Sequence, residues 1–355
     1  MSSLRPILIL VTLVALLAGG CAPGGGTTSP PSGSASAEIS PGLPSDEPSQ
    51  EPVALTVGLG YIPSVQFAPF YYADQAGYYE EAGLTVTFQN KIDPDLVTLV
   101  GQGSIDIGLA DGTSVIPAVS QGIPIRYVAT IYGRFPSIVF AKASSGIETA
   151  ADLAGKRLGI PGRYGSSWIM LQALLGSAGL TPDDLEIVEF PDFGQGAAVT
   201  QGAVDAATGF ANNEPVQLRL SGAEATVLRV DEITPLPGNG LIVGTATLEA
   251  KSDAIAAFIA ATLRAMEDIA ADPSVGLDAA IVAVPDLAAA RETQAAILEA
   301  TIEVWRGSVQ VERGLGAIEP ADWTASIAYL ESLGLVPNPV TVDDVIEIGL
   351  LPAGG

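Results

Sequence analysis

From residue 55 onwards, short apolar runs alternate with longer amphipathic stretches. The run LTVGLG begins at Leu55 and the run LTVTFQN begins at Leu84, and both have the length and composition of strands. Between them, residues 67–83 have helical spacing and end at a glycine, a common C-terminal cap. Helices predicted at 95–103 and 113–121 alternate with the strands IDIGLA, IRYVATIY and SIVFAK. Repeated strand–helix units with short loops predict a mostly parallel sheet with helices on both faces.

A second module with the same order begins near Gly146. The apolar runs LEIVEF and DAATGFA are separated by a helical stretch at 194–202, and the strand ATVLRV closes the module. A Pro- and Gly-rich stretch at 235–240 follows, and the chain resumes with the strand LIVGT. The remaining sequence is alanine-rich and amphipathic, which predicts helices that cover a sheet. These helices are expected at residues 253–271, 274–284, 287–304 and 320–333.

This order predicts one α/β lobe, a second α/β lobe and a return of the chain to the first. Lobe 1 is expected to comprise residues 54–145 and 236–355, and lobe 2 residues 146–235. The two Rossmann-like lobes are joined by two strands of the chain that pass between them, and these two connections form a hinge. Because open α/β sheets bind ligands beyond the carboxyl ends of their strands, we expect the ligand in the cleft between the lobes.

The first 53 residues have a different pattern. Arg5 is followed by the apolar run ILILVTLVALLA, two glycines and Cys21, the only cysteine in the chain. A basic start, a short apolar core and small residues predict a secretory signal peptide at residues 1–20, with an uncleaved anchor helix as the alternative. The run is shorter than the about 20 residues that a membrane span needs. Residues 21–53 lack Lys and Arg and are rich in Pro, Gly and Ser, which predicts a disordered tether.

The residues before Cys21 resemble the lipobox of bacterial lipoproteins, in which the cysteine is lipidated. A lipobox usually has leucine three positions before the cysteine, whereas this chain has Ala18 there and Leu17 one position further out. The resemblance implies that Cys21 carries a lipid. We therefore expect the protein to be anchored by its lipid to the extracytoplasmic face of the cell membrane.

The chain is strongly acidic and contains no histidine. Fifteen Lys and Arg oppose 40 Asp and Glu, which gives a formal net charge of −25. Such a field repels nucleic acids and favours neutral or cationic small molecules. The absence of histidine removes a Ser-His-Asp triad and a histidine-ligated metal site, and we expect neither a metal nor a cofactor. A carboxylate-dependent hydrolase is the enzymatic alternative, although no pair of carboxylates in two distinct environments stands out.

Aromatic and polar residues follow several of the predicted strands. Aromatic rings can stack on a flat ligand, and amides, hydroxyls and carboxylates can hydrogen-bond its polar groups. Ser114, Gln195 and Asn213 lie at such strand ends. The candidate ligand-binding residues are Tyr61, Ser64, Gln66, Phe67, Asp111, Thr113, Tyr132, Phe135, Arg163, Tyr164, Ser166, Phe193, Asn212, Glu214 and Asn239.

Each candidate also has an ordinary structural role. Asp111 stands where an N-cap is expected, which contributes about 1 kcal/mol to a helix. Phe67 can be a core residue, and Glu214 precedes a proline typical of the first helical position. The turn GRYGSS, which contains Arg163, is not a phosphate-binding Walker loop because no Gly-Lys-Ser/Thr follows.

The segment GYIPSVQFAPFYYADQAGYYEEAGL at residues 60–84 resembles the start of the solute-binding proteins related to thiamine-pyrimidine synthesis. The resemblance continues in GQGSIDIGLADGTSVIPAVSQGIPI, in SSGIETAADLAGKRLGIPG and in WTASIAYLESLGLVPNPVTVDDV. It implies a periplasmic-binding-protein type II fold, and a membrane permease and an ATPase of an ABC importer as partners. The enzymatic branch of this family depends on a histidine and a cysteine-rich segment, and both are missing here, so the resemblance implies no enzymatic activity.

Within this family, GYIPSVQFAPFYYA and GIPGRYGSS are most similar to the riboflavin-binding lipoproteins. The binders of thiamine precursors more often begin with an Asp-Trp, where this chain has Gly60-Tyr61. The resemblance therefore implies riboflavin as the ligand. An aminopyrimidine precursor of thiamine, or another small aromatic heterocycle, is the alternative.

Overall fold

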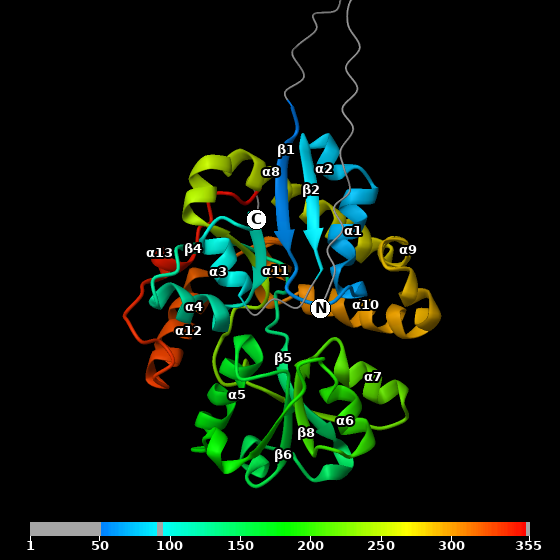
Figure 1. Ribbon diagram of the computed structural model, residues 1–355, viewed down its shortest axis with the longest axis vertical. Helices are drawn as coiled ribbons and strands as arrows, with labels where there is room; N and C mark the ends of the chain where they lie inside the picture. Colours follow the sequence, from blue (N-terminus) through cyan, green and yellow to red (C-terminus); the bar gives the residue numbers. More distant parts are fainter. Residues whose placement is uncertain (1–50, 91–94, 353–355) are drawn as a thin grey trace, which may run out of the picture. The chain divides into compact units, whose positions relative to one another are not determined.

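The computed structural model describes residues 51–90 and 95–352, which form two α/β lobes, each built around a five-stranded sheet (Figure 1). The strands of lobe 1 are β1 (Val53–Gly58), β2 (Leu84–Gln89), β3 (Ile107–Ala110), β4 (Ile125–Thr130) and β10 (Gly240–Gly244). Those of lobe 2 are β5 (Ser137–Lys142), β6 (Arg157–Ile160), β7 (Glu186–Glu189), β8 (Ala206–Phe210) and β9 (Ala225–Arg229). The sheet orders are β2-β1-β3-β10-β4 and β7-β6-β8-β5-β9.

Both sheets are mixed, and four of the five strands in each run in the same direction, as expected for a mostly parallel sheet. In lobe 1, β1 is parallel to β2 and β3, whereas β10 is antiparallel to β3 and β4. In lobe 2, β6 is parallel to β7 and β8, and β5 is antiparallel to β8 and β9. The two antiparallel strands are the ones that the chain enters directly after crossing between the lobes. They start at the cleft and run away from it, and their neighbours end there.

The first crossover lies earlier in the chain than predicted. Strand β5 was expected in lobe 1 because the boundary was placed at residue 145, but Ser137 pairs with Phe210 and Lys142 with Ala225 in the sheet of lobe 2. The chain therefore crosses at residues 131–136 and returns at residues 230–239. These two segments connect the lobes.

Lobe 1 is the larger lobe, and helices cover both faces of its sheet (Figure 1). The N-terminal helices of lobe 1 are η1 (Val65–Phe67), α1 (Ala68–Gln75), α2 (Tyr78–Glu81), α3 (Leu96–Gly101) and α4 (Gly112–Ser120). The C-terminal helices are α8 (Thr245–Ala271), α9 (Pro273–Ala283), η5 (Pro285–Ala290), α10 (Arg291–Trp305), α11 (Ser308–Arg313), α12 (Pro320–Ser332) and α13 (Val342–Val345). One core lies among α1, α2, α8, α9 and α10, and a second among α3, α4, α12 and α13.

Lobe 2 has the same sheet topology with a thinner cover. Its helices are η2 (Ala143–Ser145), η3 (Ala150–Leu153), α5 (Gly165–Ser177), η4 (Pro182–Asp184), α6 (Gln195–Gln201) and α7 (Glu214–Leu220). Helix α5 packs on one face of the sheet, and α6 and α7 pack on the other. The apolar cores on the two faces are correspondingly small.

The single helix predicted at residues 67–83 is divided in the structure. Helix α1 ends at Gln75 and α2 begins at Tyr78, because Gly77 adopts a left-handed conformation with φ of 79°. The predicted helix at 287–304 is likewise divided into η5 and α10, and two short helices, α11 and α13, were not predicted.

The predictions for the N-terminal segment fall outside the part of the chain that the structure describes. They concern the signal peptide at 1–20, the lipidated Cys21 and most of the tether at 21–53. Strand β1 begins at Val53, so the fold starts at the last residue assigned to the tether. Among residues 51–90 and 95–352, no helix is both long enough and apolar enough to cross a membrane.

Candidate functional site

A cavity of about 210 Å³ lies between the two lobes. Its walls come from the carboxyl ends of β1, β3, β6 and β8 and from the helices that follow them. Asn239 joins this wall from the amino end of β10, because an antiparallel strand begins where its neighbours end. The cleft predicted from the order of the elements is therefore present in the structure.

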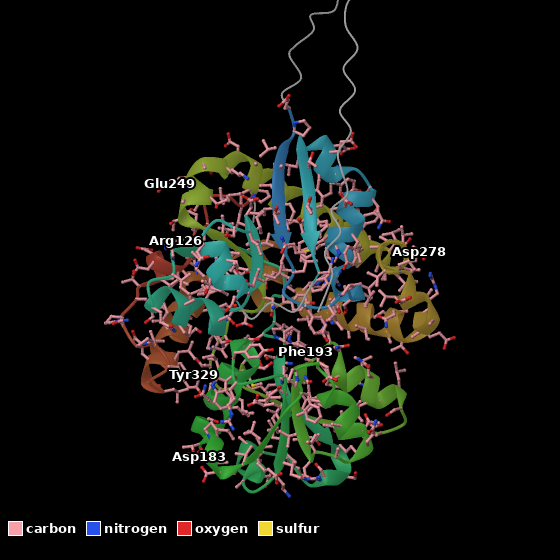
Figure 2. The ribbon with its side chains drawn as sticks, in the orientation of Figure 1. Arg126, Asp183, Phe193, Glu249, Asp278 and Tyr329 are labelled. Carbon is pink, nitrogen blue, oxygen red and sulfur yellow. The ribbon has the colours of Figure 1, made fainter. Side chains whose placement is uncertain are left out.

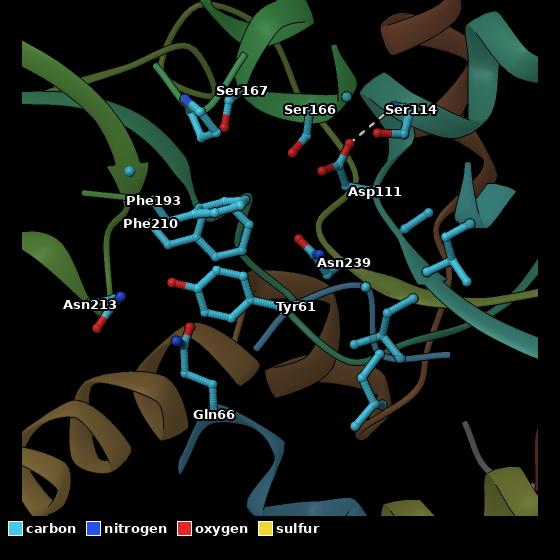
Figure 3. Close-up of a pocket in the computed structure, with 18 of the residues that line it drawn as sticks. Tyr61, Gln66, Asp111, Ser114, Ser166, Ser167, Phe193, Phe210, Asn213 and Asn239 are labelled. Atoms are coloured by element: carbon cyan, nitrogen blue, oxygen red, sulfur yellow. Dashed lines mark hydrogen bonds between the residues drawn. The ribbon is translucent and has the colours of Figure 1, made fainter. Parts of the chain in front are cut away.

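Aromatic side chains form much of the cavity wall, and they come from both lobes. Tyr61 of lobe 1 meets Phe193 of lobe 2 edge-on, with ring centroids 5.0 Å apart and an interplanar angle of 75° (Figure 3). This contact joins the two walls directly. The aromatic residues that line the cavity are Tyr61, Phe67, Tyr132, Tyr164, Phe193 and Phe210.

Phe193 is held by an unusual backbone conformation. With φ of 59°, it is the only non-glycine residue with positive φ in the described part of the chain. Its N–H donates to the carbonyl of Phe190 at 2.9 Å, and the Asp192 carboxylate accepts from the Gly194 N–H at 3.1 Å. A left-handed conformation costs a residue with a large side chain of the order of 1–3 kcal/mol. The loop between β7 and α6 therefore keeps the Phe193 ring in the cleft at an energetic cost.

Tyr61 lies half-buried in the loop after β1, opposite the start of α7. Burial raises the pKa of its hydroxyl, and the negative charge of Glu214 raises it further. Glu214 itself accepts a hydrogen bond from the Phe210 N–H at 2.7 Å, and burial raises the pKa of its carboxyl group. Tyr61 therefore stays protonated and presents a hydroxyl donor beside a carboxyl group from the other lobe.

Asp111 is buried at the start of α4, with 1 % of its surface exposed. Its Oδ1 accepts from the Thr113 hydroxyl at 2.6 Å and from the Ser114 N–H at 3.1 Å, so it is the N-cap of this helix. Burial raises the pKa of the Asp111 carboxyl group, and hydrogen bonds from Thr113, Ser114 and Ser166 act in the opposite direction. Ser166 belongs to lobe 2 and points toward Asp111 (Figure 3). Asp111 thus combines the capping role with a place in the cavity wall.

Asn212 connects the two lobes by hydrogen bonds. It follows β8 in lobe 2, is fully buried, and its Nδ2 donates to Gln66 Oε1 and to Thr301 Oγ1 of lobe 1, both at 2.9 Å. Gln66 lines the cavity and lies below the Tyr61 ring (Figure 3). Burial raises the pKa of the Tyr132 hydroxyl, and its interaction with the Asn212 side chain acts in the opposite direction.

The GRYGSS turn between β6 and α5 places Tyr164 and Ser166 at the cavity, together with Ser167. A Cβ atom at Gly162 would lie 2.3 Å from Cε1 of Tyr164, so this position must be glycine for the ring to lie across the turn. Arg163 points elsewhere: its Nε is 3.3 Å from Glu189 Oε1, and its guanidinium lies over the Trp168 ring.

Ten of the fifteen predicted residues line the cavity, and five do not. Ser64 caps η1 by accepting from the Gln66 N–H, and Thr113 is buried with its hydroxyl on Asp111. Phe135 belongs to a core of lobe 2, where 1 % of its surface is exposed. Arg163 lies in an exposed ion pair, and Asn212 lies behind the wall on Gln66. Contact with a ligand stays a prediction for the ten, which are Tyr61, Gln66, Phe67, Asp111, Tyr132, Tyr164, Ser166, Phe193, Glu214 and Asn239.

Several lining residues were not among the fifteen. Phe210 is the last residue of β8. Its place at the carboxyl end of a strand could have identified it, but it was assigned to the core of the strand. Leu96 and Val97 begin α3 and close the apolar side. Their contribution depends on how α3 packs under β1 and had no local sequence signal.

The cavity wall contains few kinds of charged side chain. None of the described residues that line the cavity is Lys or Arg, and the chain has no histidine. In residues 51–90 and 95–352, no group of three or more Asp, Glu or Cys is arranged to hold a metal ion. The wall offers aromatic faces, hydroxyls, amides and two carboxyl groups, which suits a flat, polar small molecule.

Comparison with known proteins identifies relatives along the full length of the chain. The family model described as NMT1/THI5 like matches residues 64–275. Riboflavin-binding protein RibY of Chloroflexus aurantiacus is 31% identical over 362 residues, which cover 100% of this chain and 99% of the relative. A 4-amino-5-hydroxymethyl-2-methylpyrimidine phosphate synthase of Legionella pneumophila is 27% identical over 183 residues, which cover 51% of this chain and 57% of the synthase.

Solved structures agree on the fold. The alkanesulfonate-binding protein SsuA of Xanthomonas axonopodis pv. citri superposes with a TM-score of 0.65 at 19% identity, covering 84% of this chain and 99% of SsuA. The predicted periplasmic-binding-protein type II fold is thereby confirmed. The family model covers more than half of the chain, and the full-length relative exceeds 30% identity. The chain therefore belongs to the NMT1/THI5-like family.

Proposed function

We propose that the protein is the extracytoplasmic solute-binding subunit of an ABC importer and that it captures riboflavin between its lobes. The observation that carries this proposal is the pair of aromatic walls, one from each lobe, that meet at Tyr61 and Phe193. The name of the full-length relative, riboflavin-binding protein RibY, supports the choice of riboflavin. Structural neighbours that are binding proteins support the importer role.

A flat ring system inserted between the walls would replace the contact between Tyr61 and Phe193. Each ring-to-ring contact needs about 3.5–4 Å between atoms, so a sandwiched ligand needs about 7–8 Å between the two protein rings. Their centroids are 5.0 Å apart, and the cavity of about 210 Å³ is smaller than the roughly 300–1,000 Å³ typical of drug-sized ligands. Loading with riboflavin therefore requires the lobes to separate and then to close again on the ligand.

Contacts on both sides of the cleft show how the lobes are held together. On one side, Asn212 donates to Gln66 and Thr301. On the other, the Tyr329 hydroxyl of α12 donates to the carbonyl of Ala173 in α5 at 3.1 Å (Figure 2). Few bonds cross the cleft, and two connecting segments allow rotation. This arrangement suits a clamp whose closed form is selected by the ligand.

Fluorescence titration with purified protein tests the choice of ligand. Riboflavin fluorescence should be quenched in a saturable way as its ring stacks on tyrosine, and the ligand should be recovered unchanged. Recovery of a cleaved product would instead favour the carboxylate-dependent hydrolase. Absence of quenching, with a pyrimidine binding by calorimetry, would reject riboflavin.

An aminopyrimidine is the second candidate, and two observations favour it. The cavity volume of about 210 Å³ accommodates a single small ring without separation of the lobes. Asp111 and Glu214 also present carboxyl groups that can accept hydrogen bonds from an amino group and a protonated ring nitrogen. Competition between riboflavin and 4-amino-5-hydroxymethyl-2-methylpyrimidine at the same site would rank the two ligands.

The membrane anchor is a separate proposal. Cys21 and the apolar run before it support export and lipidation, and the tether at 21–53 supports a domain that stays near its permease. Labelling of cells with a palmitate analogue should mark the wild-type protein and leave Cys21→Ser unlabelled. Labelling of both proteins would reject lipidation at Cys21.

A further inference from the structure

Asp111 lies in the cavity wall between the N-termini of two helices, one from each lobe. Helix α4 begins beside it, and the N-terminus of α5 faces it from lobe 2, with Ser166 pointing toward the carboxyl group (Figure 3). The N-cap of α5, Tyr164, makes no side-chain capping bond. Helix N-termini carry partial positive charge and bind anions. Here the protein places a carboxyl group of its own opposite the N-terminus of α5, from the other lobe.

Glu214 supplies a second carboxyl group from lobe 2. It lies over the end of β8, where a Cβ at Gly209 would come within 2.7 Å of its Oε2. Its hydrogen bonds come from the Phe210 N–H and, at 3.3 Å, from the Asn213 amide. Each lobe thus contributes one carboxyl group to the cavity, and no Lys or Arg side chain lines it among the described residues.

Gln195 adds a buried hydrogen-bond acceptor that has no partner. Its side chain lines the cavity with 1 % of its surface exposed. Its Nε2 donates to the Thr208 carbonyl at 3.3 Å, which leaves Oε1 directed elsewhere and unpaired. A buried acceptor without a partner is costly, and a hydrogen-bond donor that reaches Oε1 when a ligand binds removes that cost.

From these three features we infer that the cleft selects solutes that donate hydrogen bonds and carry no anionic group, so that it rejects phosphate esters of the molecules it binds. A phosphate would have to shed its hydration shell beside Asp111 and Glu214 with no cation to compensate. The inference rests on the proposed role of this cavity as the solute site. It also separates this chain from its synthase relatives, which are named for a pyrimidine phosphate.

Calorimetry with matched ligand pairs tests this selectivity. Wild-type protein should bind riboflavin at least about tenfold more tightly than riboflavin 5′-phosphate, and inorganic phosphate alone should not bind. Equal or tighter binding of the 5′-phosphate, or binding of inorganic phosphate to the wild-type cleft, overturns the inference. If neither flavin binds, the riboflavin proposal fails, and the same comparison is made with the aminopyrimidine and its phosphate.

Two variants assign the effect to the cleft. Asp111→Asn keeps the acceptor for the Ser114 N–H and removes the carboxyl group that faces the N-terminus of α5, so it should reduce the preference by about tenfold and create weak binding of inorganic phosphate. Glu214→Gln should reduce the preference without creating phosphate binding. Asp184→Asn, which removes one exposed charge in η4, is the control and should change neither value. Melting curves verify folding, and an unchanged preference in both cleft variants overturns the inference.

Discussion

The two lobes share one sheet topology but hold their parts of the site in different ways. In lobe 1, Phe258 stacks on Tyr79 with centroids 4.9 Å apart and on Phe70 at 6.3 Å, and these rings belong to the apolar core against which Tyr61 packs. In the described part of the chain, no two aromatic side chains of lobe 2 make a ring-to-ring contact with each other. There, Phe193 is placed by a left-handed backbone. Packing positions one wall of the cleft, and loop geometry positions the other.

The facing helices α4 and α5 show the same contrast. Asp111 caps α4 with its own side chain, whereas α5 begins at Gly165 with no side-chain cap from Tyr164. In lobe 1, the N-terminus of α4 is capped by a side chain of the same lobe. In lobe 2, the N-terminus of α5 has no such cap and is directed at the cleft. The half of the site in lobe 2 therefore depends more on what the other lobe or a ligand provides.

The largest expected effect is on core stability. Phe258→Ala should lower the free energy of unfolding by about 3–5 kcal/mol, because it removes a fully buried ring with two stacked neighbours. Phe140→Ala in lobe 2 removes an equally buried ring without such a partner, and its cost should be smaller by about 0.5–1.5 kcal/mol. Urea unfolding measures both variants. An equal or larger loss for Phe140→Ala would contradict the contrast between the cores.

Truncation of either cleft ring should weaken binding, and at Phe193 substitution should also reveal the strain of the backbone. Tyr61→Ala and Phe193→Ala should each weaken riboflavin binding by about 10–100-fold, or about 1.5–3 kcal/mol, and Tyr61→Phe should keep most of the affinity. Phe193→Gly should be more stable than Phe193→Ala by about 1 kcal/mol, because glycine adopts positive φ without strain. Fluorescence titration and melting curves measure these effects. A Phe193→Gly protein less stable than Phe193→Ala would show that the backbone there is not strained.

Loss of the bridging amide should favour separation of the lobes. Asn212→Ala removes both hydrogen bonds to lobe 1 and leaves Gln66 Oε1 buried without a donor, which should favour the open form by about 1–2 kcal/mol. Small-angle scattering should detect a larger radius of gyration. Gln217→Ala, whose amide bonds only to Asn213 within lobe 2, is the matched control. An unchanged radius for Asn212→Ala would show that other contacts hold the lobes together.

The smallest effects concern pH, and the two lobes should show opposite signs. Asp205 of lobe 2 has a pKa lowered by hydrogen bonds from Arg157, so its stabilisation is present above its unfolded pKa of about 3.9 and is lost as pH falls through the lowered value. Asp111 has a pKa raised by burial, so stability should fall as pH rises from about 3.9 through the raised value.

Urea midpoints measured from acidic to neutral pH separate the two groups. Asp205→Asn should remove part of the loss of stability in acid, and the effect should be modest because the ion pair is partly exposed. Asp111→Asn should remove part of the loss of stability that occurs as the pH rises toward neutral. If the dependence of the urea midpoint on pH changes in the same direction in both variants, these assignments are contradicted.

The alternation of strands and helices was predictable because hydrophobic period and glycine stops are local properties. The sheet that each strand joins was not. β5 is almost fully buried and would suit either sheet, and only its pairing with β8 and β9 assigns it to lobe 2. The break at Gly77 was also missed, because a glycine inside a helical pattern does not reveal whether it adopts positive φ.

The site was predictable to the extent that strand ends face the cleft. Tyr61, Gln66 and Phe193 could be proposed on that basis, and all three line the cavity. The same rule failed for Phe135, because residues at a crossover can turn into either core. It also failed for Arg163, whose carboxylate partner and stacked ring come from its own lobe and direct it away from the cleft.

The position of β10 has a consequence for the order in which the chain folds. This strand lies between β3 and β4 in its sheet, although more than a hundred residues separate it from both in sequence. A chain that emerges from its amino end can complete the sheet of lobe 2 once residue 229 is available. Lobe 1 must wait for residues 240–244 and for the helices that follow. The C-terminal segment therefore completes lobe 1, whose first strands are synthesised before lobe 2. The cleft forms only in the last stage of folding.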